Sequence, residues 1–531
     1  MNKEVGYIFP YLKSQKIKID EGEFLFQMQS HPDYPSLLSI SDTLHFFNIN
    51  NGTFRIDSSE IHLLPKRFVV TLKEEIQNQE DLIKEDIEFY LVEKDGNDFH
   101  LKNNKTRKIS YSQLKSRWDG IVLLLEEKLA DSGKKNGNGL AINYALLALL
   151  ACCFTALIFL DSSPVTWKIF VLFPVIGFLF SLLASKDLFG IESVLIDKFC
   201  NLSSGSNCSS VLESKKWKIF DFVKLSDLSL IFFATQLIAF LIFISSEASL
   251  HYFSIQKLLL IITLPVIPIS LYYQKFVEKK WCPICLAIIM ILIIEIIYLL
   301  FFINVSLTFS VKSLASFGMV LFSVFLVWKW IKNNLIKLKE LKEFNIKANR
   351  FIRNYKIFKL VLKSKNKFEL PYTPVVLDSK TNGVEITIIT SPFCGFCARA
   401  HEVLNNILSK HGNFTKLKIL FNTELENIPE TSKSLFRNLF RIYMEEGEES
   451  FRKSFDTWYK TKNIVAWLET YNKKYGYQKI DMCLAEQHKW CAHNKFNFTP
   501  AVFINGYAYP KEYDLENLEY YINELIGDTE L

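Results

Sequence analysis

Paired cysteines carry the clearest chemical signal in this 531-residue sequence. None of the ten cysteines lies before residue 152, and paired spacing on this scale is typical of redox or metal chemistry. A thiolate attacks a disulfide, and a second thiol nearby resolves the mixed disulfide that forms. Three pairs have a spacing that suits this exchange: Cys200/Cys208, Cys282/Cys285 and Cys394/Cys397. The sequence therefore predicts a protein that moves electrons between dithiols.

The Cys-x-x-Cys motif nearest the C-terminus stands between a predicted strand and a predicted helix. Cys394 would then sit at a helix N-terminus, where unpaired N–H groups and the positive end of the helix dipole stabilise a thiolate. Further along, Phe498-Thr499-Pro500 resembles the cis-proline strand that faces the dithiol in the thioredoxin superfamily. The resemblance covers about residues 380–531. It implies an α/β thioredoxin fold in which Thr499 and Pro500 support the catalytic pair Cys394 and Cys397.

Two further cysteines near the C-terminus leave several interpretations open. Cys483 and Cys491 are eight residues apart and flank Trp490, so a structural disulfide that closes a small loop is preferred. A second redox relay and a pair of reduced, unreactive thiols are the alternatives. With His493, these thiols could also complete a zinc site around the Cys-x-x-Cys motif. The order of strand, dithiol and helix favours redox chemistry, and no metal is expected.

Six long apolar runs occupy the middle of the chain. Each has roughly 18 to 25 residues, which is enough to cross about 30 Å of hydrocarbon as a helix. They lack the polar face of an amphipathic surface helix. The runs cover residues 140–160, 165–184, 228–248, 256–273, 283–303 and 305–330. We therefore expect an α-helical bundle in a multi-pass membrane protein, with the lipid bilayer as a partner.

The other two cysteine pairs lie at the edges of this bundle. Cys282-Pro-Ile-Cys285 stands at the mouth of an apolar run, where Pro283 suits the first turn of a helix. A lipid-soluble oxidant could reach two sulfurs at this boundary. Cys200 and Cys208 lie upstream in a polar loop rich in Ser and Asn. One pair on a loop and one pair at a fixed helix mouth would suit an intramolecular relay.

The spacing of these four cysteines resembles that of the vitamin K epoxide reductase family. The shared pattern starts with Cys200-x7-Cys208 and has Ser214 six residues later. Two apolar helices and the sequence Trp-Cys-Pro-Ile-Cys follow, and the pattern covers about residues 165–304. The resemblance implies a four-helix core, one additional membrane helix and a fused thioredoxin-like domain that supplies electrons.

The resemblance also implies a role for each sulfur. The loop pair would accept electrons from the thioredoxin-like partner, Cys208 would exchange with Cys282, and Cys285 would reduce a quinone of the menaquinone or ubiquinone type. Ile289 stands where the vertebrate enzymes have a Tyr near the quinone, which favours plain quinone reduction over epoxide chemistry. Glu295 is an ionisable group at membrane depth and is either a proton or quinone site or a packed residue.

The first 130 residues form a separate α+β module, helical in the first half and rich in strand patterns in the second. Asp95–Asp98 predicts a hairpin turn. Segments 31–45 and 118–126 look similar to the papain-like peptidase domain of bacteriocin-processing transporters. That family needs a catalytic Cys, which the module lacks, and Ser36 is a poor substitute nucleophile. A degenerate peptide-binding domain and a regulatory or stabilising appendage both remain open.

These patterns divide the chain into five parts. They are a degenerate peptidase-like domain (1–130), a linker with an extra membrane helix (131–164), a vitamin K epoxide reductase-like domain (165–304), a further membrane helix with a linker (305–380) and a thioredoxin-like domain (381–531). The net charge of +6 is modest for this length, so nucleic acid is not an expected partner.

Two arguments disagree about the side of the membrane on which the cysteines lie. Disulfide formation favours the oxidising, periplasmic face of a bacterial inner membrane. Lysines near the cysteine pairs, such as Lys215, Lys216, Lys279 and Lys280, would place that face in the cytoplasm under the positive-inside rule. We give the chemistry more weight and expect the periplasmic face.

The preferred hypothesis is a membrane thiol:quinone oxidoreductase that drives disulfide formation in client proteins or peptides with Cys. Electrons would pass from client thiols to the C-terminal pair, then to the loop pair, then to the membrane pair and finally to a quinone. The alternative is an accessory of peptide export or maturation, in which an inactive peptidase-like domain binds leader peptides.

Overall fold

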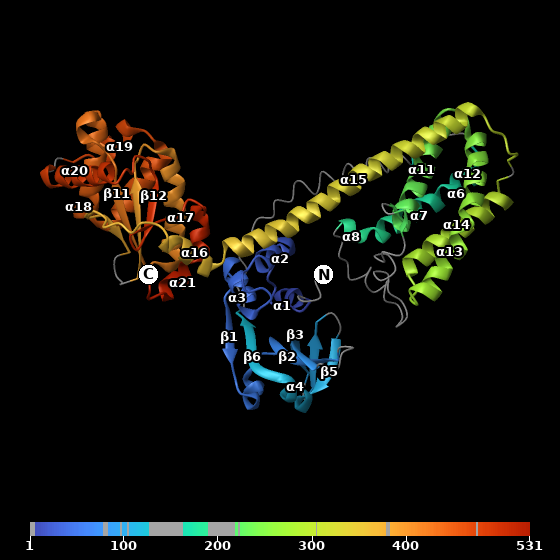
Figure 1. Cartoon of the computed structure of the whole chain (residues 1–531), viewed down its shortest axis with the longest axis horizontal. Coiled ribbons are helices and arrows are strands. Elements are labelled where there is room, and N and C mark those ends of the chain that lie inside the picture. The colour runs from blue at the N-terminus through green and yellow to red at the C-terminus, as the bar shows by residue number, and fades with distance from the viewer. Residues whose placement is uncertain are drawn as a thin grey trace. The chain divides into compact units, whose positions relative to one another are not determined.

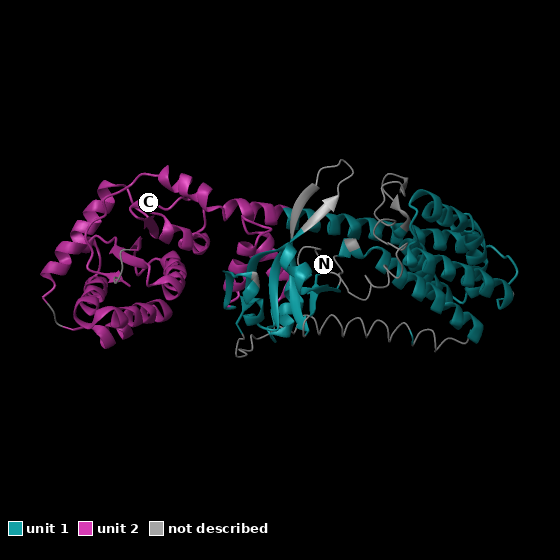
Figure 2. Cartoon of the chain, turned by 90° about the horizontal axis from the view of Figure 1, so that it is seen from below, with its two compact units in different colours: residues 1–19, 49–343 teal, residues 20–48, 344–531 magenta. Residues whose placement is uncertain are grey.

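The computed structural model describes residues 6–77, 83–95, 98–103, 106–126, 155, 163–189, 218–220, 223–303, 305–378, 383–473 and 476–531. The predictions for Cys200, Cys208 and Ser214 fall outside these ranges, as does the apolar run 140–160 apart from residue 155. The chain divides into two units, coloured in Figure 2. Unit 1 holds residues 1–19 and 49–343, and unit 2 holds residues 20–48 and 344–531.

A six-stranded sheet forms most of the N-terminal domain (Figure 1). Its order is β1-β6-β2-β3-β4-β5, and every neighbouring pair is antiparallel. Alternate residues Phe68, Val70 and Leu72 of β2 share one buried core. Pairing of Asp95 with Asp98 confirms the predicted hairpin. The elements are α1 (Ile8–Ser14), β1 (Asn51–Arg55), η2 (Ser58–Leu63), β2 (Arg67–Gln77), β3 (Ile83–Asp95), β4 (Asp98–Lys102), β5 (Thr106–Ser110), α4 (Tyr111–Arg117) and β6 (Trp118–Leu125).

Five helical segments of the described chain are long and apolar enough to cross a membrane. They span Val165–Ala184, Ser226–Ser245, Ser249–Val277, Pro283–Phe301 and Val311–Ile352. They coincide with five of the six apolar runs that the sequence predicted to be helices of membrane-spanning length. The elements are α6 (Val165–Phe170), α7 (Leu172–Ala184), α8 (Lys186–Phe189), β7 (Lys218–Phe220), β8 (Val223–Lys224), α11 (Leu225–Ser245), α12 (Ser249–Thr263), α13 (Val266–Tyr272), the π-helix η4 (Tyr273–Val277), α14 (Pro283–Phe301) and α15 (Val311–Ile352).

Four of these segments pack into a bundle around an aromatic core. Helix α7 contacts both α11 and α14, and α12 also contacts both. Phe170, Phe233, Phe240 and Phe253 lie in its centre and are buried. Gly177 lets α7 approach α11 closely, because a Cβ there would lie only 2.4 Å from the Phe233 ring.

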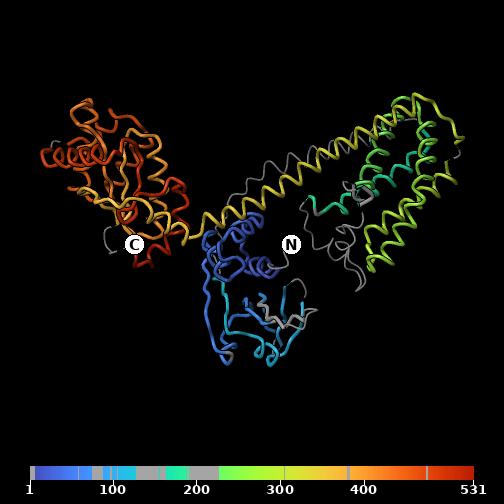
Figure 3. The backbone as a smooth tube through the Cα atoms, in the orientation of Figure 1, coloured from blue at the N-terminus to red at the C-terminus, as the bar shows by residue number. Residues whose placement is uncertain are grey.

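Helix α15 runs on well past the apolar stretch predicted to end at residue 330. It is 42 residues long and continues through the basic segment that follows the membrane span, a course that Figure 3 shows. The chain has neither Gly nor Pro between Gly318 and Pro371, so nothing in its composition interrupts the helix there.

The thioredoxin-like domain is a five-stranded sheet covered by helices (Figures 1 and 3). Its order is β13-β12-β10-β11-β9; β10 and β11 are parallel, and the other pairs are antiparallel. The strands are β9 (Val376–Leu377), β10 (Val384–Thr390), β11 (Thr415–Phe421), β12 (Ala501–Ile504) and β13 (Tyr507–Ala508). The helices are α16 (Tyr355–Lys363), α17 (Gly395–His411), η5 (Leu425–Asn427), α18 (Glu430–Thr461), α19 (Ile464–Tyr471), α20 (Gln478–His493), η6 (Leu515–Tyr520) and α21 (Ile522–Gly527).

Unit 2 reaches upstream of the predicted boundary at residue 381. Phe358 and Leu362 of α16 are fully buried in the same core as the sheet, and β9 is one of its strands. The unit also contains α2 (Glu21–Gln29) and α3 (Leu37–Phe46). Arg353 ties α2 to this core, because it donates to Gln27 Oε1 at 2.7 Å and to Tyr520 Oη at 2.9 Å. The multi-domain architecture expected from the sequence is confirmed.

Candidate thiol–disulfide active sites

The dithiol of the thioredoxin-like domain lies where β10 gives way to α17. Cys394 is the N-cap of α17, and its backbone N–H donates to Ser391 O at 3.0 Å. The N–H of Cys397 in turn donates to Cys394 O at 3.2 Å. The first turn of a helix has N–H groups without helical partners, and the dipole favours an anion there. The geometry therefore favours a thiolate at Cys394.

The Thr499–Pro500 segment lies beside this dithiol. The peptide bond between the two residues is cis, and β12 begins directly afterwards. Antiparallel pairing of Ile389 with Ala501 brings the segment next to the end of β10. The Cys394 thiol donates to the carbonyl oxygen of Thr499 at 3.2 Å. The structure thus brings together four of the residues singled out in the sequence.

The two thiols of this motif differ in acidity. Burial acts to raise the pKa of Cys394, but hydrogen bonds from Thr499, Cys397 and the backbone outweigh it and leave that pKa below its ordinary value. Cys397 is completely buried, and burial raises its pKa. Because a thiolate is the attacking species, this arrangement favours attack by Cys394 over attack by Cys397.

A buried histidine lies one helical turn beyond Cys397. His401 Nε2 is 2.9 Å from Thr390 Oγ1, and its ring packs edge-on against Phe455 with centroids 4.9 Å apart. Burial lowers the pKa of His401 from 6.5 to about 3, so the ring is neutral at neutral pH. The sequence analysis assigned no role to His401. Its place four residues after Cys397 was a usable signal that the two side chains lie on the same face of the helix.

Helix α18 covers the turn that leads into the dithiol. Trp458 Nε1 donates to Pro392 O at 2.8 Å, and the Phe393 ring packs against Trp458 with centroids 5.4 Å apart. Phe393, Phe396 and Phe498 nevertheless expose large parts of their rings. An apolar surface therefore lies next to the reactive sulfur.

The membrane dithiol also caps a helix. Cys282 is the N-cap of α14, its Sγ accepts from the Cys285 N–H at 3.3 Å, and Pro283 follows at the first helical position. Cys282 is fully buried and packs with Ala184 of α7 and Ile284, whereas Cys285 is only partly buried. The two sulfurs therefore lie at the mouth of the bundle, at the end of a membrane-spanning helix.

Gln274, which the sequence reasoning missed, fixes the backbone at this mouth. Its Oε1 accepts from the Cys282 N–H at 2.9 Å, and its Nε2 is 3.3 Å from Ser270 Oγ. Gln274 lies in the π-helix η4 and is fully buried. π-turns inside helices are frequent at functional sites. In the sequence, the available signal for this contact was a polar residue shortly before the Cys-x-x-Cys motif.

The structure corrects the prediction of a disulfide between Cys483 and Cys491. Both residues lie on the single helix α20, and both thiols are free. Eight residues of helix rise about 12 Å, which is far beyond the Cα separation that a disulfide spans. Burial raises the pKa of each thiol to about 11. The pair is therefore poorly suited to exchange.

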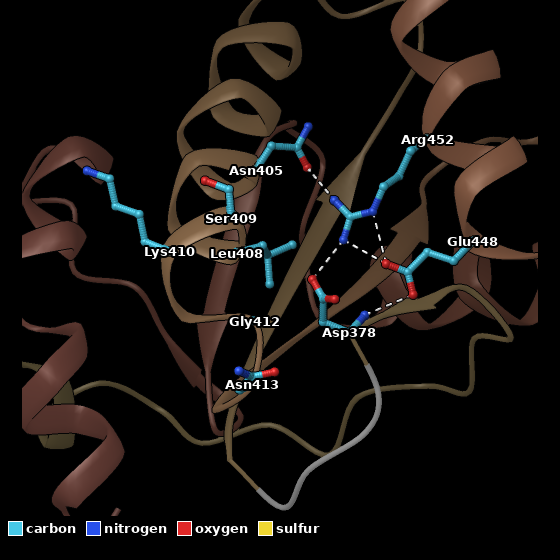
Figure 4. Close-up of a pocket in the computed structure, with 9 residues that line it drawn as sticks. All are labelled: Asp378, Asn405, Leu408, Ser409, Lys410, Gly412, Asn413, Glu448 and Arg452. Atoms are coloured by element: carbon cyan, nitrogen blue, oxygen red, sulfur yellow. Dashed lines mark hydrogen bonds and ion pairs between the residues drawn. The ribbon is translucent and has the colours of Figure 1, made fainter. Parts of the chain in front are cut away.

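No group of three His, Cys, Asp or Glu side chains within the described ranges could hold a metal ion. A hollow of about 420 Å³ lies at the opposite end of α17 from Cys394 (Figure 4). In this hollow, Arg452 forms ion pairs with Asp378 at 2.8 Å and with Glu448 at 2.7 Å, so these three charges compensate one another. It contains no redox group.

The sequence of the membrane bundle matches a known family. Residues 168–300 match the profile of the vitamin K epoxide reductase family. The match includes Cys282 and Cys285, the helices α7, α11 and α12, and all but the last residue of α14. No curated protein sequence matches the chain.

Several solved structures are similar to parts of the chain. BdbD from Bacillus subtilis is 10% identical, with 29% of this chain and 92% of that chain covered and a TM-score of 0.25. Proteus mirabilis ScsC is 16% identical, with 38% and 95% covered and a TM-score of 0.25. The peptidase domain of Streptococcus ComA is 14% identical, with 22% and 85% covered and a TM-score of 0.18.

Proposed function

We propose that this chain, which carries a vitamin K epoxide reductase family domain at residues 168–300, is a membrane thiol:quinone oxidoreductase that forms disulfides in client proteins. One observation carries the proposal. Two Cys-x-x-Cys dithiols each cap the N-terminus of a helix, one at the mouth of the membrane bundle and one in a thioredoxin-like domain. A single polypeptide thus contains a donor and an acceptor for thiol–disulfide exchange.

Each proposed step balances two electrons and two protons. A client thiolate attacks the Cys394 sulfur of the Cys394/Cys397 disulfide, and Cys397 leaves as a thiolate. The second client thiol then attacks the mixed disulfide and displaces Cys394. In the forming direction the client dithiol becomes a disulfide, while the Cys394/Cys397 disulfide becomes a dithiol. The loop pair Cys200/Cys208 then passes the reducing equivalents to the membrane pair. Closure of that last disulfide delivers two electrons and two protons to the quinone, which leaves as quinol.

The proposed order assigns the last step to Cys285. Cys285 is the less buried of the two membrane thiols, and the apolar helix α14 extends from it into the bundle. A quinone of the menaquinone or ubiquinone type could approach from the lipid phase. Cys282 is proposed to exchange with Cys208, with Ser214 supporting the loop. These assignments follow from the family resemblance.

Client thiols are proposed to dock on the apolar surface beside Cys394. Phe396 has 82% of its side-chain surface exposed, and Phe393 and Phe498 are about half exposed. An extended peptide could bury these rings while its own sulfur reaches Cys394. We further propose that this face lies on the periplasmic side of a bacterial inner membrane, because disulfides persist there.

The N-terminal domain is proposed to bind partners without peptidase activity. Ser36, which stands about where the missing nucleophile would be, is the N-cap of α3. Its Oγ accepts from the Ser39 N–H at 3.1 Å, so its local contacts are those of a helix cap. This supports a structural role for Ser36.

Replacement of Cys285 tests the proposal. We expect Cys285→Ala in the full chain, reconstituted in lipid with a dithiol donor and a soluble quinone, to reduce quinone no faster than empty vesicles. Cys483→Ala is the control, since that thiol is weakly acidic and lies outside both dithiols, and it should keep full activity. Quinone reduction by Cys285→Ala at the rate of the control would refute the proposal.

A further inference from the structure

Gln274 joins the end of one membrane-spanning segment to the start of the next. It lies in η4, near the end of the span Ser249–Val277, and the dithiol helix α14 begins at Pro283. The turn between them donates twice to this residue. The Lys280 N–H donates to the main-chain oxygen of Gln274 at 3.1 Å, and the Cys282 N–H donates to its Oε1 at 2.9 Å. A single glutamine therefore binds the turn at two points.

The side-chain amide of Gln274 is held in one orientation. Its Nε2 donates to Ser270 Oγ, one helical turn earlier, at 3.3 Å, and both side chains are buried. The amide nitrogen can only donate and the amide oxygen can only accept. Because the nitrogen is directed to the Ser270 hydroxyl, the oxygen is directed to the Cys282 N–H. Ser270 thus fixes which end of the amide faces the dithiol.

The Cys282 N–H depends on an acceptor from outside its own helix. Cys282 is the N-cap of α14, with an extended backbone at φ −105° and ψ 105°, and a helix offers no acceptor to the first of its N–H groups. Since Cys282 is fully buried, solvent does not replace a lost acceptor there. A buried N–H without an acceptor is costly. Gln274 therefore favours the N-cap conformation of Cys282 over others.

The N-cap conformation determines what the Cys282 sulfur contacts. Its Sγ accepts from the Cys285 N–H at 3.3 Å, at the positive end of the α14 dipole. A sulfur in such a place is stabilised as a thiolate. In the proposed relay, Cys282 becomes a thiolate when Cys200 attacks the mixed disulfide between Cys208 and Cys282. The Cys200–Cys208 bond forms, the Cys208–Cys282 bond breaks, and the electron pair of the broken bond stays on Cys282.

We propose that Gln274 is a positioning residue of the membrane dithiol and holds Cys282 in the conformation that stabilises its thiolate. This inference rests on the proposed function and adds to it a residue outside the cysteine pairs. Gln274 acts through the backbone of Cys282, and Ser270 acts through the amide of Gln274. The competing explanation is that Gln274 only stabilises the fold of the bundle.

The pH profile of Cys282 alkylation separates these two explanations. Every sample is the full-length protein in lipid with Cys285→Ala, which leaves one thiol in the motif and keeps the backbone N–H at position 285. Gln274→Leu removes the acceptor. Gln256→Leu is the matched control, because Gln256 is an equally buried glutamine that pairs with Gln236 in the core of the same bundle. The reaction of Cys282 with N-ethylmaleimide is read by mass spectrometry and requires neither quinone nor client.

The inference predicts a shift in one variant alone. The midpoint of the Cys282 profile should rise by about one pH unit in Gln274→Leu, which is about a tenfold loss of thiolate at a fixed pH below the midpoint, and should not move in Gln256→Leu. Ser270→Ala keeps the acceptor but frees the amide, so its midpoint should rise by a smaller amount.

Two results would overturn the inference. One is a midpoint in Gln274→Leu equal to that of the parent protein, and the other is an equal shift in Gln274→Leu and Gln256→Leu. If Gln274→Leu does not fold, Ser270→Ala decides the question, and an unchanged midpoint in that variant then overturns the inference. Either way, quinone reduction by the wild type is measured separately and would still support the proposed function.

Discussion

Contacts of individual residues make the two thiols of the thioredoxin-like dithiol differ in acidity. Cys394 has its pKa held down by hydrogen bonds, whereas Cys397 is buried with its pKa raised. Thr499 interacts with the outer sulfur through its carbonyl oxygen at 3.2 Å, and its hydroxyl favours the thiolate. The asymmetry of the pair therefore depends on a residue more than one hundred positions away in the sequence.

Thr499→Val should make Cys394 less acidic. The substitution keeps the shape of the side chain and removes the hydroxyl that stabilises the thiolate, so the pKa of Cys394 should rise toward its ordinary value and alkylation at pH 7 should slow several-fold. The measurement is the iodoacetamide rate at Cys394 against pH, read by mass spectrometry. Thr387→Val is the control. Thr387 lies on β10, and its Oγ1 has no hydrogen-bond partner among the described residues. Equal profiles for the two variants would contradict this account.

His401 should make the thioredoxin-like domain sensitive to acid. Its pKa is about 3 when folded against 6.5 for a free histidine, so above pH 6.5 neither state is protonated and no stability is lost. As the pH falls from 6.5 toward 3, the unfolded chain binds a proton that the folded chain cannot, and stability falls by about 1.4 kcal/mol per pH unit. Pulse proteolysis of the full chain, followed on fragments from 383–531, should show a shallower slope for His401→Leu. The same replacement at exposed His493 is the control, and a slope in His401→Leu as steep as in the control would refute the assignment.

At the residue scale, the sequence predicted two dithiols at helix N-termini, where the structure has them, and missed most of the side chains that contact them. The Cys-x-x-Cys and Thr-Pro motifs are made of residues that are close together in the sequence, so they can be recognised without knowledge of the fold. Gln274 and His401 reach the neighbourhood of the two dithiols through contacts that form only after folding. The error at Cys483 and Cys491 had a different cause: Ile480, Leu484, Gln487 and Cys491 form a buried helical stripe, and that periodicity excluded the loop that a disulfide needs.

At the scale of elements, close packing of α7 on α11 determines how the membrane bundle is built. Gly177 has no Cβ, and the Phe233 ring fills the space where one would lie. The sequence predicted both helices from their apolar length but not this contact, because its two members are on different helices. Small residues at helix crossings are a general means of close approach in membranes.

Gly177→Ala should destabilise the bundle by about 1–3 kcal/mol, because the added methyl group must displace Phe233 or separate the helices. Thermal unfolding in detergent measures the effect, and the midpoint should fall by several degrees. Gly318→Ala on α15 is a matched control, because a Cβ there meets no heavy atom within 4 Å. Identical midpoints for the two variants would show that the contact is not needed.

At the scale of the whole molecule, composition, periodicity and the resemblance to known families together predicted the architecture. Five apolar runs are membrane-length helices, the strand alternation of the first domain forms a sheet, and the last domain has the predicted thioredoxin-like order. The start of that last domain was harder to place. Phe358 and Leu362 of α16 enter its core from before the predicted boundary, because a short amphipathic helix looks like part of a linker until its partner surface is known.

The central claim, an electron path from the thioredoxin-like dithiol through Cys285 to quinone, is tested most directly by one anaerobic measurement. Fully reduced, full-length protein in lipid is mixed with an excess of quinone over its three proposed dithiols, and every cysteine is then scored for oxidation by differential alkylation and mass spectrometry. The account predicts that Cys394 and Cys397 become oxidised in the wild type and stay reduced in Cys285→Ala. Oxidation of Cys394 and Cys397 to the same extent in Cys285→Ala, or no oxidation of them in the wild type, would contradict it.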